Sequence, residues 1–344
     1  MAKLKTGYIP PFTITPAIVR LISEISESIG GFSVTNPSEI APLLRRGNRL
    51  RSIQASLAIE NNTLTLEQVT AIISGKKILG HPREIQEVKN AFATYEMIEK
   101  LNPLSINDLL KAHKIMMDAL ADESGRFRSG GVGIMKGKKV VHIAPPAARV
   151  SALMNDLFTW IKETDVHPLI ASSVFHYEFE FIHPFSDGNG RMGRLWQTLI
   201  LKRWRPILAY LPVETVISNR QDEYYHVLGR SDQQADSTAF VEFMLKAILE
   251  SLRETIKSDQ DSDQDNDQVK KLLKIFDRNP LSASDIMRKI NLSHRPTFRK
   301  NYLNPAISKG FIEMTIPDKP NSRLQKYRIT PKGITFIKEN QSQA

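Results

Sequence analysis

One short segment, residues 183–194, gathers groups that together could bind a phosphate. It reads HPFSDGNGRMGR and runs into an apolar stretch that predicts a helix. Gly188 and Gly190 permit unusual backbone angles, so N–H groups here can converge on an anion at the helix N-terminus. Arg191 and Arg194 are three residues apart and would share one helical face. Two guanidinium groups beside such N–H groups suit more than one phosphate.

Two more side chains of the segment indicate what would happen to that phosphate. Asp187 is a hard oxygen ligand next to the predicted anion site, which suits Mg²⁺ bridging phosphates. His183 is the only base of the segment that titrates near neutral pH. A polyphosphate, a magnesium ion and a proton acceptor together predict nucleotide-dependent transfer onto a hydroxyl group.

Other interpretations of the segment are weaker. A glycine-rich turn with solvated charges would explain a lone Gly-Asn-Gly, but not a base, a carboxylate and two arginines within twelve residues. A metal site built from His176 and His183, with Glu178 and Glu180 between them, does not have a usual zinc spacing. A P-loop would need Lys-Ser or Lys-Thr after the glycines, and neither follows here.

The segment resembles the signature of Fic-domain proteins, HxFx(D/E)GNGRxxR, with every fixed position present. The resemblance covers residues 101–257 well and the N-terminal region less closely. Members of this family typically transfer AMP from ATP to a protein hydroxyl. The Doc-type phosphotransferases carry a bulkier residue in place of the first glycine, so Gly188 favours nucleotidyl transfer over phosphorylation.

The resemblance implies a role for each position of the segment. His183 is the general base for the target hydroxyl, Asp187 is the Mg²⁺ ligand, and Phe185 is an anchor in the core. The glycines form the phosphate nest and the two arginines bind the outer phosphates. The implied nucleotide-binding residues are Gly188, Asn189, Gly190, Arg191, Met192, Gly193 and Arg194.

An inhibitory motif is the second point of resemblance. Residues 56–61 read SLAIEN and are similar to the family pattern (S/T)xxxE(G/N). Ser56 and Glu60 are four residues apart and lie on one helical face. Glu60 could pair with Arg194 and occupy the guanidinium that the γ-phosphate needs. The resemblance therefore predicts that the chain inhibits its own nucleotide transfer.

Residues 129–146 break the helical pattern and predict a β-hairpin that turns at Gly137. By position and type the hairpin is similar to the flap of Fic proteins. That resemblance implies that it holds a target segment by β-augmentation. The strand expected to face the active site contains Val132, Gly133, Ile134 and Met135.

A pair of tyrosines follows the core helix. Tyr224 and Tyr225 fit the pair that borders adenine in family members, where an aromatic face can stack on the base. An asparagine commonly follows eight residues after the first tyrosine in the family, and Asp232 stands there instead.

The body of the chain has helical periodicity. Asn61 is a plausible helix terminator, and Thr65 with Gln68 predicts a capping box on the helix that follows. The predicted helices include residues 88–100, 106–119, 150–163, 170–181, 195–202 and 238–257.

The last quarter of the chain has a different charge. Residues 269–344 contain 16 basic and 5 acidic residues, while the whole chain has 47 and 37, so the entire positive excess lies here. An acidic, low-complexity stretch precedes it and predicts a linker. The order of predicted helices and strands in this basic region suggests a winged helix-turn-helix, with wing strands at 307–312 and 326–329. Arg295, Arg299 and Lys300 on its recognition helix could meet DNA, although such modules also dock proteins.

The composition of the chain excludes all sites that depend on cysteine. The 344 residues include no cysteine, which rules out disulfides, thiolate zinc sites and a cysteine nucleophile. This fits a cytoplasmic protein. No apolar run is as long as a membrane span, and no signal peptide is evident.

We therefore expect a mainly α Fic core with a hairpin flap, followed by an α+β winged helix. The expected function is transfer of AMP from Mg-ATP to Ser, Thr or Tyr of a target protein or of the chain itself, restrained by Glu60. The alternatives are removal of AMP from a target and a nucleotide-sensing DNA-binding regulator. A homodimer is a further expected partner. The expected regions are 1–100 (with an inhibitory helix at about 45–61), 101–257 (core), 258–268 (linker) and 269–344 (winged helix).

Overall fold

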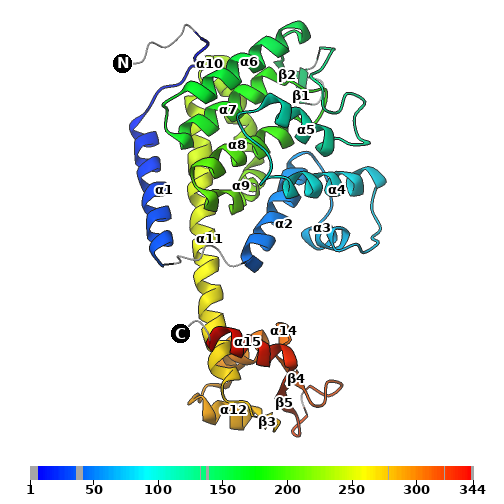
Figure 1. The fold of residues 1–344 in the computed structure, drawn as a ribbon, viewed down its shortest axis with the longest axis vertical. Coiled ribbons are helices and arrows are strands. Elements are labelled where there is room, and N and C mark those ends of the chain that lie inside the picture. The colour runs from blue at the N-terminus through cyan, green and yellow to red at the C-terminus, as the bar shows by residue number, and fades with distance from the viewer. Residues whose placement is uncertain are drawn as a thin grey trace. The chain divides into compact units, whose positions relative to one another are not determined.

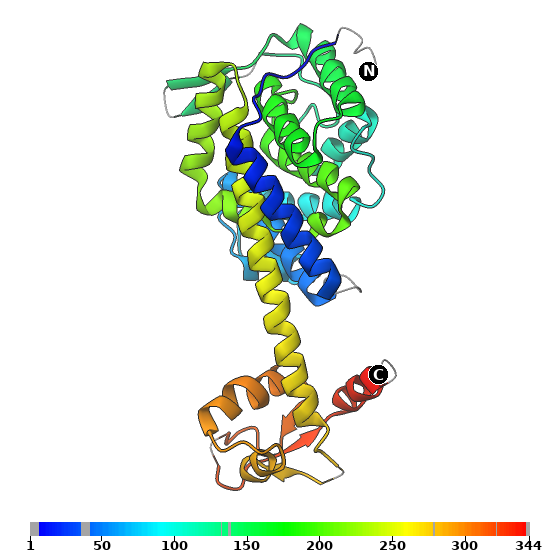
Figure 2. The same cartoon turned by 90° about the vertical axis from the view of Figure 1, so that its left-hand side faces the viewer.

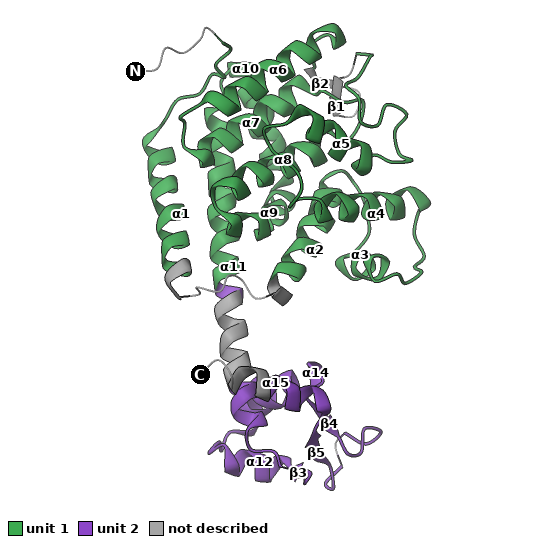
Figure 3. Ribbon diagram, in the orientation of Figure 1, with its two compact units in different colours: residues 1–256 green, residues 257–344 purple. Residues whose placement is uncertain are grey.

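The structure, a computed structural model, describes residues 7–35, 42–131, 133–136, 139–277, 279–320 and 322–341. The chain divides into two compact units, residues 1–256 and residues 257–344 (Figure 3). The first unit holds residues 183–194, the segment whose chemistry the sequence predicts.

The first unit is built from helices and one hairpin (Figure 1). Its helices are α1 (Pro16–Thr35), α2 (Pro42–Ile59), α3 (Leu66–Ile73), α4 (Pro82–Glu96), α5 (Ile106–Met116), α6 (Ala147–Glu163), α7 (Pro168–Ile182), α8 (Asn189–Trp204), the 3₁₀ helix η1 (Pro206–Tyr210), α9 (Val213–Asn219), α10 (Gln221–Gln234) and the start of α11 (Thr238–Leu273).

Helices α7 and α8 form the centre of this unit and carry the predicted site between them. Thirteen of the fifteen residues of α7 are buried, and most of them are apolar or aromatic. The core of the unit includes large side chains such as Phe175, Phe179 and Trp196. The turn that connects α7 to α8 is therefore held between two buried helices.

The end of α2 follows the sequence prediction. Asn61 has a φ of 69°, a left-handed conformation that asparagine tolerates and that ends the helix. The Thr65 hydroxyl accepts from the Gln68 N–H, and the Gln68 side chain accepts from the Thr65 N–H. The predicted capping box is confirmed, and it fixes the start of α3 directly after the predicted inhibitory motif.

Helix α1 lies along α11 within the first unit (Figure 2). The Arg253 guanidinium pairs with the Glu24 carboxylate at 2.8 Å. The Thr15 hydroxyl donates to Glu242 at 2.7 Å, just before α1 begins. These contacts fasten the N-terminal helix to the body of the unit.

The predicted hairpin is present. Strand β1 (Gly133–Lys136) pairs antiparallel with β2 (Lys139–Ile143), with Gly133 opposite Ile143 and an irregularity after Ile134. Of the residues predicted to face the active site, Gly133, Ile134 and Met135 lie on β1, and Val132 lies outside the described residues. The predicted turn residue Gly137 also lies outside them.

A buried carboxyl group on α7 predicts a pH effect on the stability of this unit. Burial raises the pKa of Glu178 to about 7, while Tyr8 donates to its Oε2 at 2.8 Å. The folded state therefore binds an extra proton between the ordinary pKa and about pH 7, and stability falls as the pH rises through that range. Replacement by glutamine removes the cost of the buried charge. We compare the free energy of unfolding of Glu178→Gln with that of the parent by urea unfolding at pH 5 and at pH 8. We expect the difference to shift in favour of the variant by up to about 3 kcal/mol between the two pH values.

Glu163→Gln is the control for this experiment, because Glu163 is an exposed carboxylate at the end of α6. The free energy of unfolding of this variant should differ from that of the parent by the same amount at pH 5 and at pH 8. If the free energy of unfolding of Glu178→Gln also differed from that of the parent by the same amount at both pH values, an elevated pKa at Glu178 would be contradicted.

The acidic stretch predicted as a linker is helical instead. Helix α11 runs from Thr238 to Leu273, so it continues through residues 258–268. That stretch is polar but has neither glycine nor proline, and these are the residues that interrupt a helix most strongly. The boundary between the two compact units nevertheless falls at residues 256 and 257.

The second unit has a small core and a three-stranded antiparallel sheet in the order β3-β5-β4. The predicted wing strand at 307–312 is misplaced, because α14 occupies its first residues and β4 begins at Ile312. Arg295, Arg299 and Lys300 are exposed on the predicted recognition helix. The elements are β3 (Leu281–Ser282), α12 (Ala283–Lys289), α13 (Arg295–Phe298), the π-helix η2 (Arg299–Leu303), α14 (Asn304–Ser308), β4 (Ile312–Met314), β5 (Lys326–Ile329) and α15 (Pro331–Gln341).

None of the helices among the described residues combines the length and the apolar character needed to cross a membrane.

Candidate functional site

His183 lies at the C-terminal end of α7 in a left-handed conformation, with φ 50° and ψ 61°. Its Nδ1 lies 3.2 Å from the carbonyl oxygen of Glu180. Because a carbonyl only accepts hydrogen bonds, Nδ1 carries the proton and donates it. The lone pair of the neutral ring then belongs to Nε2. The fold therefore prepares His183 to accept a proton at Nε2.

The turn after His183 is shaped by Asn189. Its Oδ1 accepts from the Phe185 N–H at 2.9 Å, and its Nδ2 donates to the Phe185 carbonyl at 2.8 Å. Gly188 has a φ of 84°, and a Cβ there would lie 2.7 Å from the Met117 sulfur. Glycine is thus required at this position for both backbone angle and space. The Asn189 side chain holds the turn together and is not directed at a ligand.

A second histidine supports the turn from α5. The His113 ring stacks on Phe185 with centroids 3.6 Å apart and an interplanar angle of 5°. Nδ1 accepts from the Gly125 N–H at 2.9 Å, so Nε2 carries the proton and donates to the Asp187 carbonyl at 3.0 Å. Burial lowers the pKa of His113 to about 4, which keeps the ring neutral. His113 therefore fixes the backbone of Asp187.

Arg191 lies in the first turn of α8 and is buried, with a side-chain exposure of 4%. Its Nη2 donates to Asp187 Oδ1 at 3.0 Å, while Nε and Nη1 are buried and have no hydrogen-bond partner among the described residues. Nη1 lies 3.8 Å from Glu87 Oε1. Arg83 of α4 pairs with the other Asp187 oxygen at 3.0 Å. Because buried donors are normally satisfied, the two atoms of Arg191 indicate a ligand that accepts hydrogen bonds.

Arg194, one turn further along α8, is tied to α2. Its Nη2 lies 2.9 Å from Glu60 Oε1 and 2.9 Å from the Ser56 carbonyl, and its Nε donates to the Ser56 hydroxyl at 3.1 Å. Burial would lower the pKa of Arg194, but the charge of Glu60 raises it above its usual value. A Cβ on Gly190 would collide with Glu60 and Arg194. The pair predicted for Glu60 and Arg194 is thus formed in this structure.

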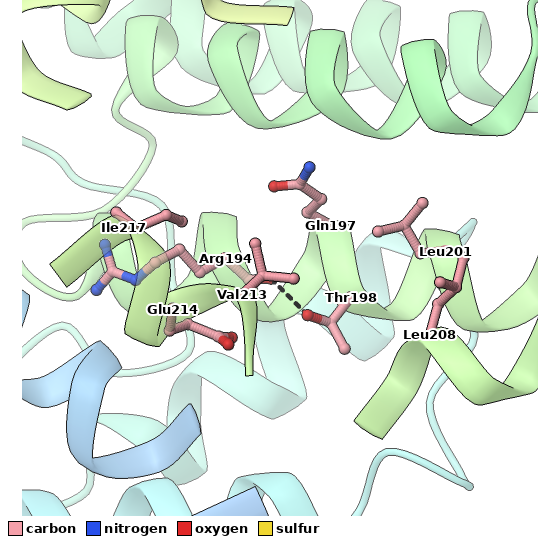
Figure 4. A pocket seen from close by; sticks show the side chains of 8 residues that line it. All are labelled: Arg194, Gln197, Thr198, Leu201, Leu208, Val213, Glu214 and Ile217. Carbon is pink, nitrogen blue, oxygen red and sulfur yellow. Dashed lines mark hydrogen bonds between the residues drawn. The ribbon is translucent and has the colours of Figure 1, made fainter. Parts of the chain in front are cut away.

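A buried carboxylate, Glu214, lies behind Arg194. Glu214 of α9 accepts from the Ser52 hydroxyl of α2 at 2.9 Å and from the Tyr95 hydroxyl at 3.1 Å. A cavity of about 10 Å³ lies here, lined by four polar side chains (Arg194, Gln197, Thr198 and Glu214) and by apolar side chains (Figure 4). It has room for no more than about one water molecule, so a nucleotide would have to bind on the other side of Arg194.

The two predicted adenine-binding tyrosines occupy different environments. Tyr224 is 1% exposed and its hydroxyl lies 3.2 Å from His176 Nε2, so it packs in the core. Tyr225 is 39% exposed and retains ring surface beside the end of α2. Asp232 accepts from the Tyr177 hydroxyl at 3.0 Å.

Two further residues of the predicted nucleotide-binding set pack inside the unit. Met192 is fully buried. A Cβ on Gly193 would lie 2.9 Å from Glu180 Oε1 and 3.0 Å from the His176 ring, so glycine is needed for close packing of α8 on α7.

One solved structure is similar to this chain along nearly its whole length. A crystal structure of a Fic family protein from Desulfovibrio desulfuricans is 60% identical in sequence, with a TM-score of 0.74. The alignment covers 95% of this chain and 99% of that one. The chain belongs to the Fic family.

Two family models locate the Fic regions within the chain. The Fic/DOC family model matches residues 103–201, which include the whole of α7 and the turn at His183. The C-terminal domain of Filamentation induced by cAMP protein Fic-like matches residues 267–330.

Curated relatives carry an activity in their names. The protein adenylyltransferase Fic of Nematostella vectensis is 31% identical over 206 residues, and that of Drosophila erecta is 29% identical over 215 residues. The alignments cover 56% and 58% of this chain, but the chain spans less than half the length of these relatives, 45% and 41%. A Fic domain containing signaling protein of Bacteroides thetaiotaomicron shares the fold, with 22% identity, a TM-score of 0.58, and coverage of 71% of this chain and 98% of that one.

Several residues at the Fic site were not found from the sequence. Arg83 and Glu87 of α4 approach Asp187 and Arg191, and their i, i+4 spacing on one face was the available signal. His113 is a polar residue on the buried face of α5, which a search for loop motifs does not detect. Glu214 lies far from the motif in sequence and offered no local signal.

Proposed function

We propose that this Fic protein transfers AMP from ATP to a hydroxyl group of a protein. The observation that carries the proposal is the buried Arg191 beside the glycine turn, whose Nε and Nη1 have no hydrogen-bond partner in the part of the chain that the structure describes. A phosphate at the start of α8 would accept from both atoms and from the backbone N–H groups there. The names of the curated relatives support the same activity.

The expected reaction uses His183 as the base. Nε2 accepts the proton of the target hydroxyl, and the hydroxyl oxygen attacks the α-phosphorus of ATP. A new P–O bond forms as the bond to the β-phosphate oxygen breaks, and pyrophosphate leaves with the bonding electrons. Arg191, and Arg194 once Glu60 has released it, would stabilise the negative charge that develops on the outer phosphates. Tyr225 has the ring surface that could border the base.

Asp187 fits a magnesium ion that is shared with the nucleotide. The described residues contain no cluster of three or more His, Cys, Asp or Glu side chains that could hold a metal by themselves. A single carboxylate beside a phosphate site is nevertheless the usual arrangement for Mg²⁺, which takes its other ligands from phosphates and water. Mg²⁺ would neutralise phosphate charge there. Asp187 would have to exchange its contacts with Arg83 and Arg191 for the ion.

His113 offers a matched pair of variants that tests how the turn holds the ion. Glutamine can place a donor where His113 Nε2 bonds the Asp187 carbonyl, and asparagine can place an acceptor where Nδ1 bonds the Gly125 N–H. In the presence of ATP, we expect His113→Asn to weaken Mn²⁺ binding about tenfold and His113→Gln to weaken it less. Electron paramagnetic resonance of bound Mn²⁺ measures both. Equal loss in the two variants would contradict a specific role for the bond to Asp187.

The chemical test of the proposal uses the Glu60→Gly variant, in which Arg194 is released. The purified variant is incubated with Mg²⁺ and with ATP labelled either at the α- or at the γ-phosphate. We expect protein-bound label only from the α-position, together with one pyrophosphate released for each AMP attached. Transfer of the γ-label would instead identify a kinase, and absence of both labels from the protein, with cell lysate as target, would overturn the proposal.

The acceptor in this proposal is a protein hydroxyl, and self-modification supplies one without a separate target. Binding of DNA by Arg295, Arg299 and Lys300, and pairing with a second copy of the chain, stay predictions.

A further inference from the structure

Arg128 is a buried cation between the catalytic turn and the hairpin. It is 3% exposed, although arginine is among the residues that proteins rarely bury unless they are paired. It stands in the segment that leads from α5 to β1. In the described part of the chain, every hydrogen bond recorded for its guanidinium goes to a backbone carbonyl.

Two of these carbonyls belong to the catalytic end of α7. Nε donates to the His183 oxygen at 2.7 Å, and Nη2 lies 3.3 Å from the Ile182 oxygen. The backbone N–H of Arg128 also donates to the Pro184 carbonyl at 2.9 Å. The last carbonyls of a helix have no partners within it and carry partial negative charge, which explains how the fold stabilises a buried guanidinium here.

The other two carbonyls belong to the base of the hairpin. Nη1 donates to the Gly130 oxygen at 2.8 Å, just before β1, and Nη2 donates to the Pro145 oxygen, just after β2. One side chain therefore bonds both ends of the hairpin and the backbone of His183. The planar guanidinium has its donors in fixed directions, so it sets the spacing among these three backbone segments.

We propose that Arg128 is a positioning residue that fixes the hairpin at the correct distance from His183, so that a polypeptide held along the hairpin presents its hydroxyl to Nε2. This inference rests on the proposed function. Transfer requires the attacking oxygen to be about 3–3.5 Å from the phosphorus, and a misplacement of about 1 Å can cost about a hundredfold in rate. Lysine keeps the charge of Arg128 but cannot bond all four carbonyls at once.

The test compares Arg128→Lys with Arg126→Lys, both made in the Glu60→Gly background. Arg126 is an exposed arginine two residues away and serves as the matched control. Three quantities are measured: the rate of self-labelling from α-labelled ATP, the increase in melting temperature on adding ATP, and hydrogen exchange of the amides in β1 and β2. We expect Arg128→Lys to lose about a hundredfold in labelling and to exchange the hairpin amides at least tenfold faster. The increase in melting temperature with ATP should be retained, and Arg126→Lys should match the background in all three.

Each other outcome has a definite meaning. Unchanged labelling or unchanged hairpin exchange in Arg128→Lys overturns the inference. Loss of the ATP-dependent shift in both Arg128→Lys and Arg128→Gln also overturns it, because Arg128 would then support the fold of the whole turn. If the Glu60→Gly background labels no protein, even with cell lysate as target, the proposed function fails, and the hairpin exchange still decides whether Arg128 holds the hairpin.

Discussion

We expect Glu60→Gly to increase the rate of self-labelling from α-labelled ATP by about ten- to a hundredfold over the unaltered chain. In the structure the Glu60 carboxylate lies 2.9 Å from Arg194 Nη2, and the Arg194 side chain is buried while that of Glu60 is one third exposed. A hydrogen bond between charged groups contributes about 1.5–3 kcal/mol, and each 1.4 kcal/mol corresponds to a factor of ten. Without the carboxylate, Arg194 can bind the outer phosphate without first breaking its pair with Glu60, so this free energy no longer opposes transfer.

The site would otherwise remain intact in this variant. Arg194 keeps its bonds to the hydroxyl and carbonyl of Ser56, so the guanidinium stays near its present position. Glycine at position 60 also fits the backbone, because α2 has already ended at Ile59. The measured quantity is the initial rate of label incorporation at saturating ATP, with Mg²⁺ present.

Glu67→Gly is the matched control for this experiment. It removes an exposed carboxylate and adds a glycine in the neighbouring helix α3, without touching Arg194. Its labelling should equal that of the parent chain. If Glu60→Gly stays as silent as the control, even with cell lysate as target, inhibition by Glu60 is wrong. Removal of AMP from a target, with Glu60 orienting water, would then be favoured, and loss of that activity in Glu60→Gly would identify it.

How much of this site could be predicted depends on how far apart its residues lie in the sequence. The turn from His183 to Arg194 is a continuous segment, and its chemistry follows from residue types that the chain places side by side. The partners that fix it come from elsewhere: Arg83 is 104 residues from Asp187, and His113 is 74 residues away. Only packing brings them together. Ser56 and Glu60 were found because a helical spacing links them to a known motif.

The same reasoning applies to the tyrosine pair and to the acidic stretch. Tyr224 and Tyr225 are adjacent and equally aromatic, so composition could not show which of them faces the core. The stretch at 258–268 has the composition of a linker, yet it contains neither glycine nor proline, and α11 continues through it. Composition indicated where the compact unit ends but not the backbone conformation there. In contrast, the capping box at Thr65 depends on local hydrogen bonds alone and was predicted correctly.

The largest loss of activity is expected at His183. In the Glu60→Gly background, we expect His183→Ala to reduce labelling by about 10²–10⁴-fold, the range that a positioned general base contributes. The bond from Nδ1 to the Glu180 carbonyl leaves the lone pair on Nε2, and the alanine variant lacks this acceptor for the proton of the target hydroxyl. The affinity for ATP should change little, since the proposed phosphate contacts come from α8.

The comparison with His226→Ala makes this test specific. His226 is exposed on α10, so its loss removes an imidazole without altering the turn. We expect that variant to label at the rate of the Glu60→Gly background, with ATP binding measured by calorimetry equal in all three proteins. Equal labelling by the His183 and His226 variants would exclude base catalysis by His183. The nucleotide-sensing interpretation would then account better for a site that binds ATP, because sensing requires the arginines and the glycine turn but no proton acceptor.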